Sequence, residues 1–388
     1  MPGYELIGDE EKKAVDEVFE KSGVLFRHGF DKQRSGIYKV DEFEKEFIKK
    51  FNVKHARAVS SGTAALLAAL KALKIKRGDE VITQSFTFVA TVEAIIEAGA
   101  IPVIAEINET LNMDPADLEK KITEKTKAII PVHMLGVPCQ LDEINKIAKE
   151  KNIPVLEDTA QAIGGEYKGK KLGTIGDVGI FSFDFGKTIT TGEGGMIITN
   201  NGEIYNLAKE YSDHGHQENP NLPRYEDSRR IGGFNFSMTE LQGAVGVAQF
   251  KKLDYILSCQ RENKNKIKEG IKDIKEIKFR ELPDEKGDCG DALVFFVENK
   301  EKAKEIGKKL QECGIGVKNI PSAMTWHFSG TWEHMLPQFD MYKGKNLMDI
   351  WKKSYDIVSR AVAVPIMVKM DDQKIKETIE KLRGILKS

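Results

Sequence analysis

Several features that place a protein in a specialised class are scarce in this sequence of 388 residues. Its four cysteines are widely scattered, without CxxC or His/Cys metal spacing, so we expect free thiols that take no part in catalysis. Its 59 basic and 60 acidic residues nearly cancel, which argues against nucleic acid or an anionic membrane surface as a partner. The longest apolar runs have the length of strands, so no membrane span is expected.

Targeting and nucleotide signatures are also lacking. Met1-Pro2-Gly3 leads directly into a polar helix rather than a signal-type segment, which predicts a cytoplasmic protein. No GxGxxG follows the first strand, so a dinucleotide site is unsupported. The segment 164–171 has Gly-Lys at Walker spacing, but it lies in a polar turn rather than between a strand and a helix. We therefore exclude both nucleotide-binding motifs.

The apolar pattern alternates between strands and helices over the first two thirds of the chain. This alternation predicts an α/β fold with a mainly parallel sheet and helices on both faces, with sites at the carboxyl ends of the strands. A long lysine-rich helix at 255–272 reads as the connection to a small α+β domain. We predict a large domain over 1–254 and a small one over 255–388.

The stretch 179–195 is the strongest candidate for chemistry. Two apolar runs flank a glycine-rich loop that contains Lys187, and this lysine has no charged neighbour between Asp184 and Glu193. Apolar and hydroxyl-lined surroundings lower the pKa of a lysine and free its amine for a Schiff base. The alternative is a hairpin turn whose lysine points into water.

Two further segments favour a site at the strand ends. Residues 60–66, Ser-Ser-Gly-Thr-Ala-Ala-Leu, end a strand and begin a helix, whose first N–H groups and dipole suit a phosphate. An ordinary Ser/Thr helix cap is the alternative. Glu157 and Asp158 directly follow an apolar strand, where paired carboxylates suggest chemistry, although one of such a pair is often a cap.

Loop residues provide weaker candidates. Arg27, between apolar and basic neighbours, could bind a carboxylate or phosphate, or could be a surface arginine. His214 and His216 have no third metal ligand nearby, so hydrogen bonding within the loop is favoured over a metal. The polar segment 217–230 is expected to be a mobile or partner-facing loop.

Taken together, five segments in this order resemble the fold-type I, pyridoxal phosphate (PLP)-dependent sugar aminotransferases of the DegT/DnrJ/StrS type. The resemblance implies a mainly parallel seven-stranded sheet in the large domain, PLP as cofactor, and transfer of an amino group from an amino acid, expected to be glutamate, to a sugar. The five segments are Ser60–Leu66, Phe86–Thr91, Leu156–Ala162, Ser182–Lys187 and Gly192–Gly195.

The resemblance also implies roles for single residues. Lys187 would form the Schiff base with PLP, and Asp158 would pair with the pyridine nitrogen. Asn235 would reach the phosphate in the neighbouring subunit, which requires a homodimer. The other implied contacts are Gln161 to the ring hydroxyl, Phe88 stacked on the ring, and Gly62, Thr63 and Ser182 on the phosphate.

A closer likeness exists to the branch that makes 8-amino-3,8-dideoxy-manno-octulosonate (8-amino-Kdo) for lipopolysaccharide. Its acceptor carries a carboxylate and no nucleotide, and Asp184 stands where many other relatives have His. The segments shared with this branch are Met1–Leu6, Phe26-Arg27, 182–190, 212–216 and Trp326-His327. Hypothetical ligands for the acceptor are Arg27, His214, His216 and His327.

Two alternatives stay open. One is an aminotransferase that acts on a 3-keto or 4-keto nucleotide-linked deoxysugar. The other is a non-catalytic regulatory protein with the same fold, against which the intact Lys187 and Asp158 argue. The retained lysine also favours transamination over the sugar 3-dehydratase branch, in which histidine replaces it.

Overall fold

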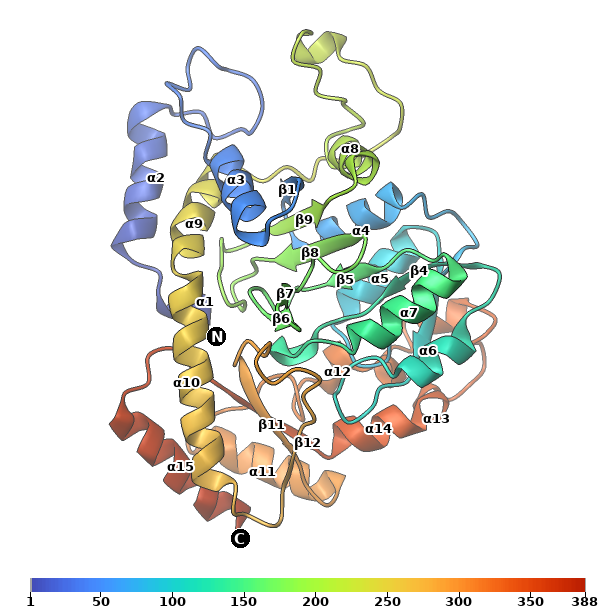
Figure 1. Ribbon diagram of the computed structural model, residues 1–388, viewed down its shortest axis with the longest axis vertical. Helices are drawn as coiled ribbons and strands as arrows, with labels where there is room; N and C mark the ends of the chain where they lie inside the picture. Colours follow the sequence, from blue (N-terminus) through green and yellow to red (C-terminus); the bar gives the residue numbers. More distant parts are fainter. Residues whose placement is uncertain (1, 388) are drawn as a thin grey trace.

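A seven-stranded sheet forms the centre of the computed structural model, which describes residues 2–387 (Figure 1). Within these residues its strands lie in the order β1-β9-β8-β5-β4-β2-β3, where bridges Ile129–Val155 and Val132–Asp158 join β4 to β5. Only β9 runs antiparallel to its neighbours, so the predicted mainly parallel sheet is confirmed. The strands are β1 (His55–Val59), β2 (Glu80–Gln84), β3 (Ile101–Ala105), β4 (Thr126–Ile130), β5 (Leu156–Asp158), β8 (Val178–Ser182) and β9 (Gly195–Thr199).

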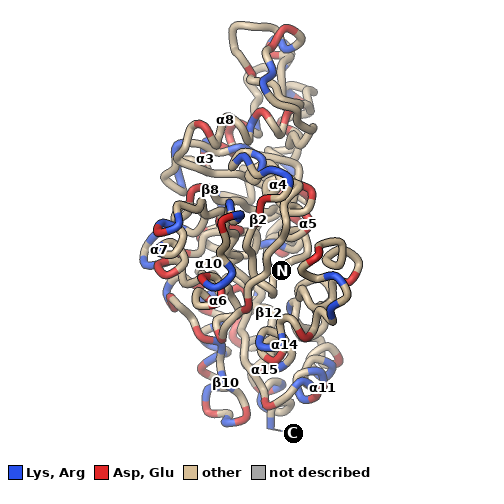
Figure 2. The backbone as a smooth tube through the Cα atoms, turned by 90° about the vertical axis from the view of Figure 1, so that its right-hand side faces the viewer, with Lys and Arg blue, Asp and Glu red and all other residues tan. Residues whose placement is uncertain are grey.

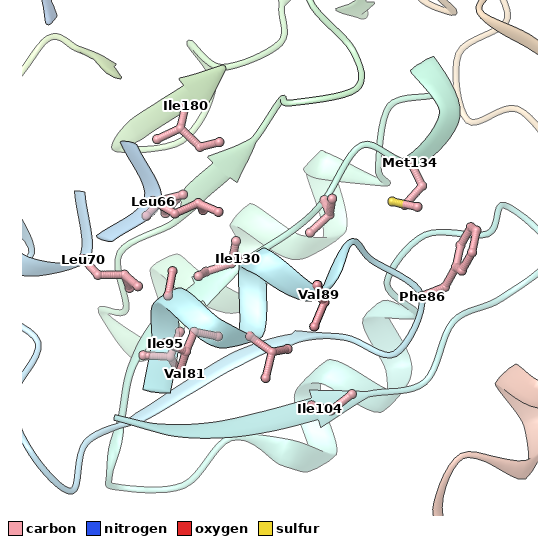
Figure 3. Close-up of a cluster of buried hydrophobic side chains, with 14 of the residues drawn as sticks. Leu66, Leu70, Val81, Phe86, Val89, Ile95, Ile104, Ile130, Met134 and Ile180 are labelled. Carbon is pink, nitrogen blue, oxygen red and sulfur yellow. The ribbon is translucent and has the colours of Figure 1, made fainter. Parts of the chain in front are cut away.

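Both faces of the sheet are buried, because neighbouring residues of each strand point to opposite sides. Val81 joins one apolar cluster and Ile82 the other, and Ile180 and Phe181 divide in the same way. Figure 3 shows the first cluster, in which side chains of the strands pack against Leu66 and neighbouring helical residues. Residues buried on both faces explain why the strands read as nearly continuous apolar runs.

Helices cover each face. The first face carries α4 (Gly62–Ala72), α5 (Val89–Glu97) and α8 (Gly202–Tyr211), whose apolar residues join that cluster. The second face carries α3 (Lys39–Phe51), α6 (Pro115–Lys121), α7 (Leu141–Lys151) and α9 (Glu240–Lys251). Outside these layers lie α1 (Pro2–Glu5), α2 (Asp9–Lys21) and the short strands β6 (Glu166–Tyr167) and β7 (Lys170–Lys171).

The predicted connecting helix is α10 (Leu253–Ile271), which leads to a second, antiparallel sheet of three strands in the described chain. The sequence pattern predicts strands at 277–279 and 293–297 and helices at 302–313 and 372–386 in this region. All four are present, the last with the same bounds and the others shifted by one or two residues, whereas β12 was not predicted. The elements of this region are β10 (Lys278–Phe279), β11 (Ala292–Phe296), α11 (Lys300–Glu312), β12 (Ala361–Pro365) and α15 (Asp372–Leu386). The domain boundary at 254/255 stays a prediction.

Part of the C-terminal sequence returns to the large sheet. It contains α12 (Met324–His327), α13 (Leu347–Ile350) and α14 (Lys352–Ser359). Trp351 donates its indole N–H to the Ile104 carbonyl at 3.0 Å, and Tyr342 donates its hydroxyl to the Pro102 carbonyl at 2.8 Å. Both aromatic rings therefore tie this segment to the outer strand β3, and the docked segment brings residues of the small domain to the strand ends.

Charged residues of both signs are spread along the chain. Figure 2 shows basic and acidic positions interspersed along the tube. Among residues 2–387, no helix combines the length and the hydropathy that a membrane-spanning helix needs.

Candidate active site

A cavity of about 340 Å³ opens at the carboxyl ends of the parallel strands. Segments that follow β1, β2, β4, β5 and β8 line one side, and residues of the C-terminal part of the chain line the other. Ligands in α/β sheets bind at this edge because the loops that leave the strands converge there. The cavity contains seven of the residues that the sequence analysis assigned to the cofactor: Gly62, Thr63, Phe88, Asp158, Gln161, Ser182 and Lys187.

Asp158 and Glu157 occupy adjacent positions in β5 and point in opposite directions. Asp158 lines the cavity and accepts hydrogen bonds from the Thr91 hydroxyl at 2.9 Å and the Ala160 N–H at 3.1 Å. Burial raises the pKa of Asp158, while these two hydrogen bonds and the charge of Lys187 oppose the shift. A cationic partner at this position, such as a protonated ring nitrogen, keeps the carboxylate ionised.

Glu157, in contrast, is a structural carboxylate. It accepts hydrogen bonds from three backbone N–H groups of the loop before β8, at 2.6 to 2.9 Å, and lies 3.2 Å from His133 Nε2. Of the adjacent pair, only Asp158 can take part in chemistry in the cavity. The other residue holds a loop, in place of the helix cap considered above.

Lys187 lies in the loop between β8 and β9, which pair in antiparallel fashion, and the two strands are those expected from the apolar runs around this loop. The turn is held by Asp184, whose carboxylate accepts the Gly186 N–H at 2.8 Å and whose carbonyl accepts the Lys187 N–H at 3.0 Å. Burial lowers the pKa of Lys187, nearby carboxylates led by Asp184 oppose this shift, and the ammonium of Lys318 adds to it. The structure thus supplies the environment that favours a nucleophilic amine.

The N-terminal segment packs against the outside of this loop. The Gly3 N–H donates to the Lys187 carbonyl at 3.1 Å, and the Tyr4 ring stacks on Phe185 with centroids 5.2 Å apart. The carboxylate of Glu5 accepts the N–H groups of residues 368 and 369, which follow β12. Residues 3–5, part of a segment singled out in the sequence, therefore link the lysine loop to the C-terminal part of the chain. Met1, the first residue of that segment, lies outside the described residues.

The beginning of α4 provides the expected anion site. Ser61 caps the helix by accepting the Ala64 N–H at 3.0 Å. The first helical turn, at Gly62 and Thr63, lines the cavity. A Cβ at Gly62 would lie 2.8 Å from Ser182 Cβ, so a glycine is needed for this close approach. This set of groups fits PLP: helix N–H groups and two hydroxyls at one end of the cavity for a phosphate, with a buried carboxylate and a lysine for the ring and its aldehyde.

Two residues complete the ring-binding side. Phe88 is 38% exposed, lies at the cavity wall and has its ring centroid 6.0 Å from that of Trp326 in a nearly parallel arrangement. Gln161 accepts the Leu135 N–H at 3.1 Å and the Asn319 side-chain amide at 3.4 Å, and these two hydrogen bonds fix its orientation. The stacking and ring-hydroxyl roles of these residues stay predictions.

Comparison with known proteins assigns this geometry to a family. A sequence model of the DegT/DnrJ/EryC1/StrS aminotransferase family matches residues 8–383. The chain belongs to this family. The aminotransferases of this family are PLP-dependent, and this chain is a PLP-dependent sugar aminotransferase.

Individual relatives support the assignment over most of the chain. The GDP-perosamine synthase of Escherichia coli O157:H7 is 38% identical over 282 residues, which span 71% of this chain and 73% of the relative. The spore coat polysaccharide biosynthesis protein SpsC of Bacillus subtilis is 34% identical over 98% of this chain and 96% of its own. An aminotransferase structure from Psychrobacter cryohalolentis superposes with a TM-score of 0.85 at 26% identity, covering 98% of this chain and 97% of that one.

Thr91, Asp291, Lys318 and Asn319 are among the cavity residues of this aminotransferase to which the sequence analysis assigned no role. Thr91 lies in the segment 86–91, which the sequence analysis had already connected with the site. The spacing of its hydroxyl, one helical turn after Thr87, could have indicated that both hydroxyls lie near Asp158. The other three, Asp291, Lys318 and Asn319, come from the C-terminal part of the chain and carry no motif. Of the proposed acceptor ligands, only His327 lines the cavity.

The other three predicted acceptor ligands, Arg27, His214 and His216, do not line the cavity of their own chain, and their role toward an acceptor stays a prediction. Arg27 is buried and donates to Glu44 at 2.8 Å and to the Ala58 carbonyl at 3.2 Å. Burial acts to lower its pKa, but the neighbouring carboxylates, led by Glu44, keep the pKa above the ordinary value. His216 is buried beside Asp227 at 3.3 Å, and His214 is exposed on a turn. The Arg27 guanidinium and the His216 ring thus have partners within the chain.

Asn235 also lies outside the cavity lining of its own chain. It is exposed, and its side-chain oxygen accepts the Ser237 N–H at 3.1 Å. Its role toward a neighbouring subunit stays a prediction.

One cluster in the described chain has ligand atoms at metal-binding spacing: His28, Asp213 and Glu218. Arg224 forms a two-pronged ion pair with Asp213, and Arg57 pairs with Glu218 at 2.7 Å. The arginines already balance both carboxylates, so the cluster is a buried ion-pair network that anchors the loop after α8.

Proposed function

We propose that this enzyme transfers an amino group from an amino acid, expected to be glutamate, to the keto carbon of a nucleotide-linked deoxysugar. The observation that carries the proposal is the pairing of Lys187 and Asp158 in one cavity of a chain whose relatives include GDP-perosamine synthases. Those names favour a nucleotide-linked acceptor over the octulosonate acceptor.

The residues of the cavity divide the work of transamination. Bound PLP supplies an electron sink for the charge that remains when the donor loses its Cα proton. Asp158 keeps the ring nitrogen protonated through its negative charge. The Nζ of Lys187, with its lowered pKa, takes the proton from the donor Cα as a general base and returns a proton in the second half of the cycle.

Binding of the cofactor involves both ends of the cavity. Gly62, Thr63 and Ser182 would hold the phosphate at the beginning of α4, while Gln161 and Phe88 would contact the ring. We further propose a homodimer in which Asn235 reaches the phosphate of the neighbouring subunit. Replacement of Asn235 by Ala then weakens PLP binding; an unchanged affinity contradicts this role.

The octulosonate branch supplies a second candidate acceptor. It is favoured by the N-terminal segment shared with that branch, because Gly3 and Tyr4 contact the lysine loop directly. A non-catalytic regulatory role is disfavoured, because a regulatory protein has no need for an amine and a carboxylate kept at shifted pKa values in one cavity.

The test is the absorption spectrum of the PLP-loaded enzyme before and after glutamate, with Lys187→Ala beside it. Conversion of the pyridoxal band to the pyridoxamine form by the wild type supports transamination, and we expect Lys187→Ala to slow it by about 10²–10⁴-fold. A wild-type spectrum that does not respond to any amino acid overturns the proposal.

The acceptor is tested with the amino-loaded enzyme. Return of the pyridoxal band with a GDP-linked 4-keto-6-deoxysugar supports the nucleotide-linked acceptor. Return only with a free 8-oxo sugar acid replaces it with the octulosonate acceptor.

A further inference from the structure

Acidic side chains outnumber basic ones in the lining of the cavity. Two lysines and no arginine line it among the residues that the structure describes. The negative groups are Asp158, Asp184, Glu193 and Asp291, and a bound cofactor adds its phosphate. With Lys187 committed to the cofactor, Lys318 is the remaining permanent cation for an incoming anion.

Lys318 is held in place before any ligand arrives. Its ammonium forms an ion pair with Asp291, whose side chain is 3% exposed, and its backbone N–H donates to the Ala363 carbonyl at 2.8 Å. An ammonium carries three donors, and the contact with Asp291 takes one of them. The remaining donors are on a side chain that lines the cavity, and the ordering cost of a flexible lysine is already met.

The position of Lys318 is close to the reaction centre. Its charge contributes to the lowered pKa of both Lys187 and His327, which places it near the reacting amine. The next residue, Asn319, donates its amide to Gln161 at 3.4 Å. Lys318 and Lys187 thus line the same cavity from its two walls.

A second lysine–aspartate ion pair in the same part of the chain does not reach the cavity, unlike the pair of Lys318 and Asp291. Lys264 and Asp288 form a similarly buried lysine–aspartate pair, with side chains 8% and 7% exposed, on α10 and the segment before β11. Neither residue lines the cavity. A lysine–aspartate pair can therefore brace this region without reaching the active site, whereas the pair at Lys318 opens onto it.

We propose that Lys318, positioned by Asp291, is the carboxylate-binding residue of this cavity. The proposal rests on the transamination proposed above and specifies how that site recognises its substrates. The carboxylate comes from the amino-acid donor or from a sugar-acid acceptor. A neutral sugar ring has no carboxylate. Measuring the donor half-reaction and the acceptor half-reaction separately therefore shows which of the two substrates Lys318 binds.

The experiment measures each half-reaction in single turnovers of the holoenzyme. In Lys318→Met we expect the apparent Kd for glutamate to rise about 10- to 100-fold, the effect of one charge-assisted hydrogen bond, with little change in the limiting rate. Lys318→Arg restores much of the affinity. The double variant Lys318→Met/Asp291→Asn avoids an unpaired buried carboxylate and shows the same loss if the single variant is unstable.

Lys264→Met is the matched control, because it removes an equally buried ion pair outside the cavity. It lowers stability and leaves the glutamate Kd unchanged. A second readout does not need turnover: calorimetric binding of glutarate, a dicarboxylate without an amine, weakens in Lys318→Met by a factor similar to that for glutamate. Conversion of a simple alkyl amine without a carboxylate keeps its wild-type rate.

The outcomes are distinct. A loss confined to a sugar-acid acceptor assigns the same residue to the acceptor carboxylate. Unchanged binding of glutarate and both carboxylate substrates overturns the proposal, as does a loss confined to a nucleotide-linked acceptor. If Lys318→Met slows the conversion of the alkyl amine as much as it weakens the reaction with glutamate, the proposal is also overturned. Lys318 would then affect the reactivity of Lys187 rather than bind a carboxylate. If the wild type fails to react with any amino acid, the proposed function fails, while the glutarate comparison still tests Lys318.

Discussion

The two walls of the cavity are built in different ways. The wall on the large domain comes from residues that directly follow strands, so Asp158 and Lys187 each lie within five residues of a strand end. The opposite wall contains Lys318, on an irregular segment, and His327, at the end of the short helix α12, both brought there by docking of the C-terminal chain. The difference teaches that residues on the wall proposed for the cofactor can be found from the local sequence around each strand. Residues on the opposite wall reach the cavity only through the packing of distant segments.

The largest predicted effect tests the cofactor wall. Asp158→Asn keeps the shape of the side chain and removes the charge opposite the ring nitrogen. We expect the limiting rate with glutamate to fall about 100-fold or more, measured by stopped-flow absorbance. A rate within threefold of the wild type would contradict the assigned role.

The neighbouring carboxylate should respond differently. Glu157→Gln replaces an acceptor of three backbone N–H groups, and we expect the free energy of unfolding in urea to fall by about 2 kcal/mol. The limiting rate of the folded protein stays near that of the wild type. If the rate instead falls as in Asp158→Asn, the two faces of β5 are not functionally distinct.

The substrate wall should be sensitive to acid through His327. Burial lowers its pKa to about 4, and the hydrogen bond of its Nδ1 with the Ala323 carbonyl opposes the shift. The unfolded chain binds the proton near pH 6.5, so stability falls as the pH drops from 6.5 toward 4. By pH 5 we expect a loss of roughly 1–2 kcal/mol from this group.

Urea unfolding across this pH range checks the expectation. His327→Asn should flatten the profile, leaving the slope due to His28, whose pKa is also lowered by burial to about 4. The exposed His214→Asn is the control and should follow the wild type. A His327→Asn profile as steep as that of the wild type would show that this histidine is not the titrating group.

The smallest predicted effect concerns the outside of the lysine loop. Gly3→Ala would place a Cβ 2.8 Å from the Lys187 carbonyl oxygen, and this displaces the hydrogen bond from the Gly3 N–H. We expect the limiting rate with glutamate to fall about 2- to 10-fold. Gly8→Ala, where a Cβ meets only a side-chain atom at 3.8 Å, is the matched control. Equal rates in both variants would remove the N-terminal segment from the support of Lys187.

Sequence reasoning worked best where one local pattern is sufficient. The apolar spacing predicts helices over 9–21 and 141–151, and both helices have these bounds in the structure because their spacing is regular. The apolar run at 153–156 predicts a strand there, but the paired strand is Leu156–Asp158, since a buried apolar run does not mark which of its residues pair. The segment between α11 and β12 was left without elements, because its aromatic residues pack against strands about 240 residues away.

By itself the sequence determined the cofactor half of this aminotransferase. Lys187, Asp158 and the glycine-hydroxyl turn at Gly62 each sit beside a strand that the apolar pattern identifies, so the rule that sites gather at strand ends brings them together. Only the tertiary structure decided that Asp158, rather than Glu157, faces the cavity and that Lys318 reaches it. Those outcomes depend on the direction of a side chain and on contacts between distant segments, which the packing of the whole chain establishes.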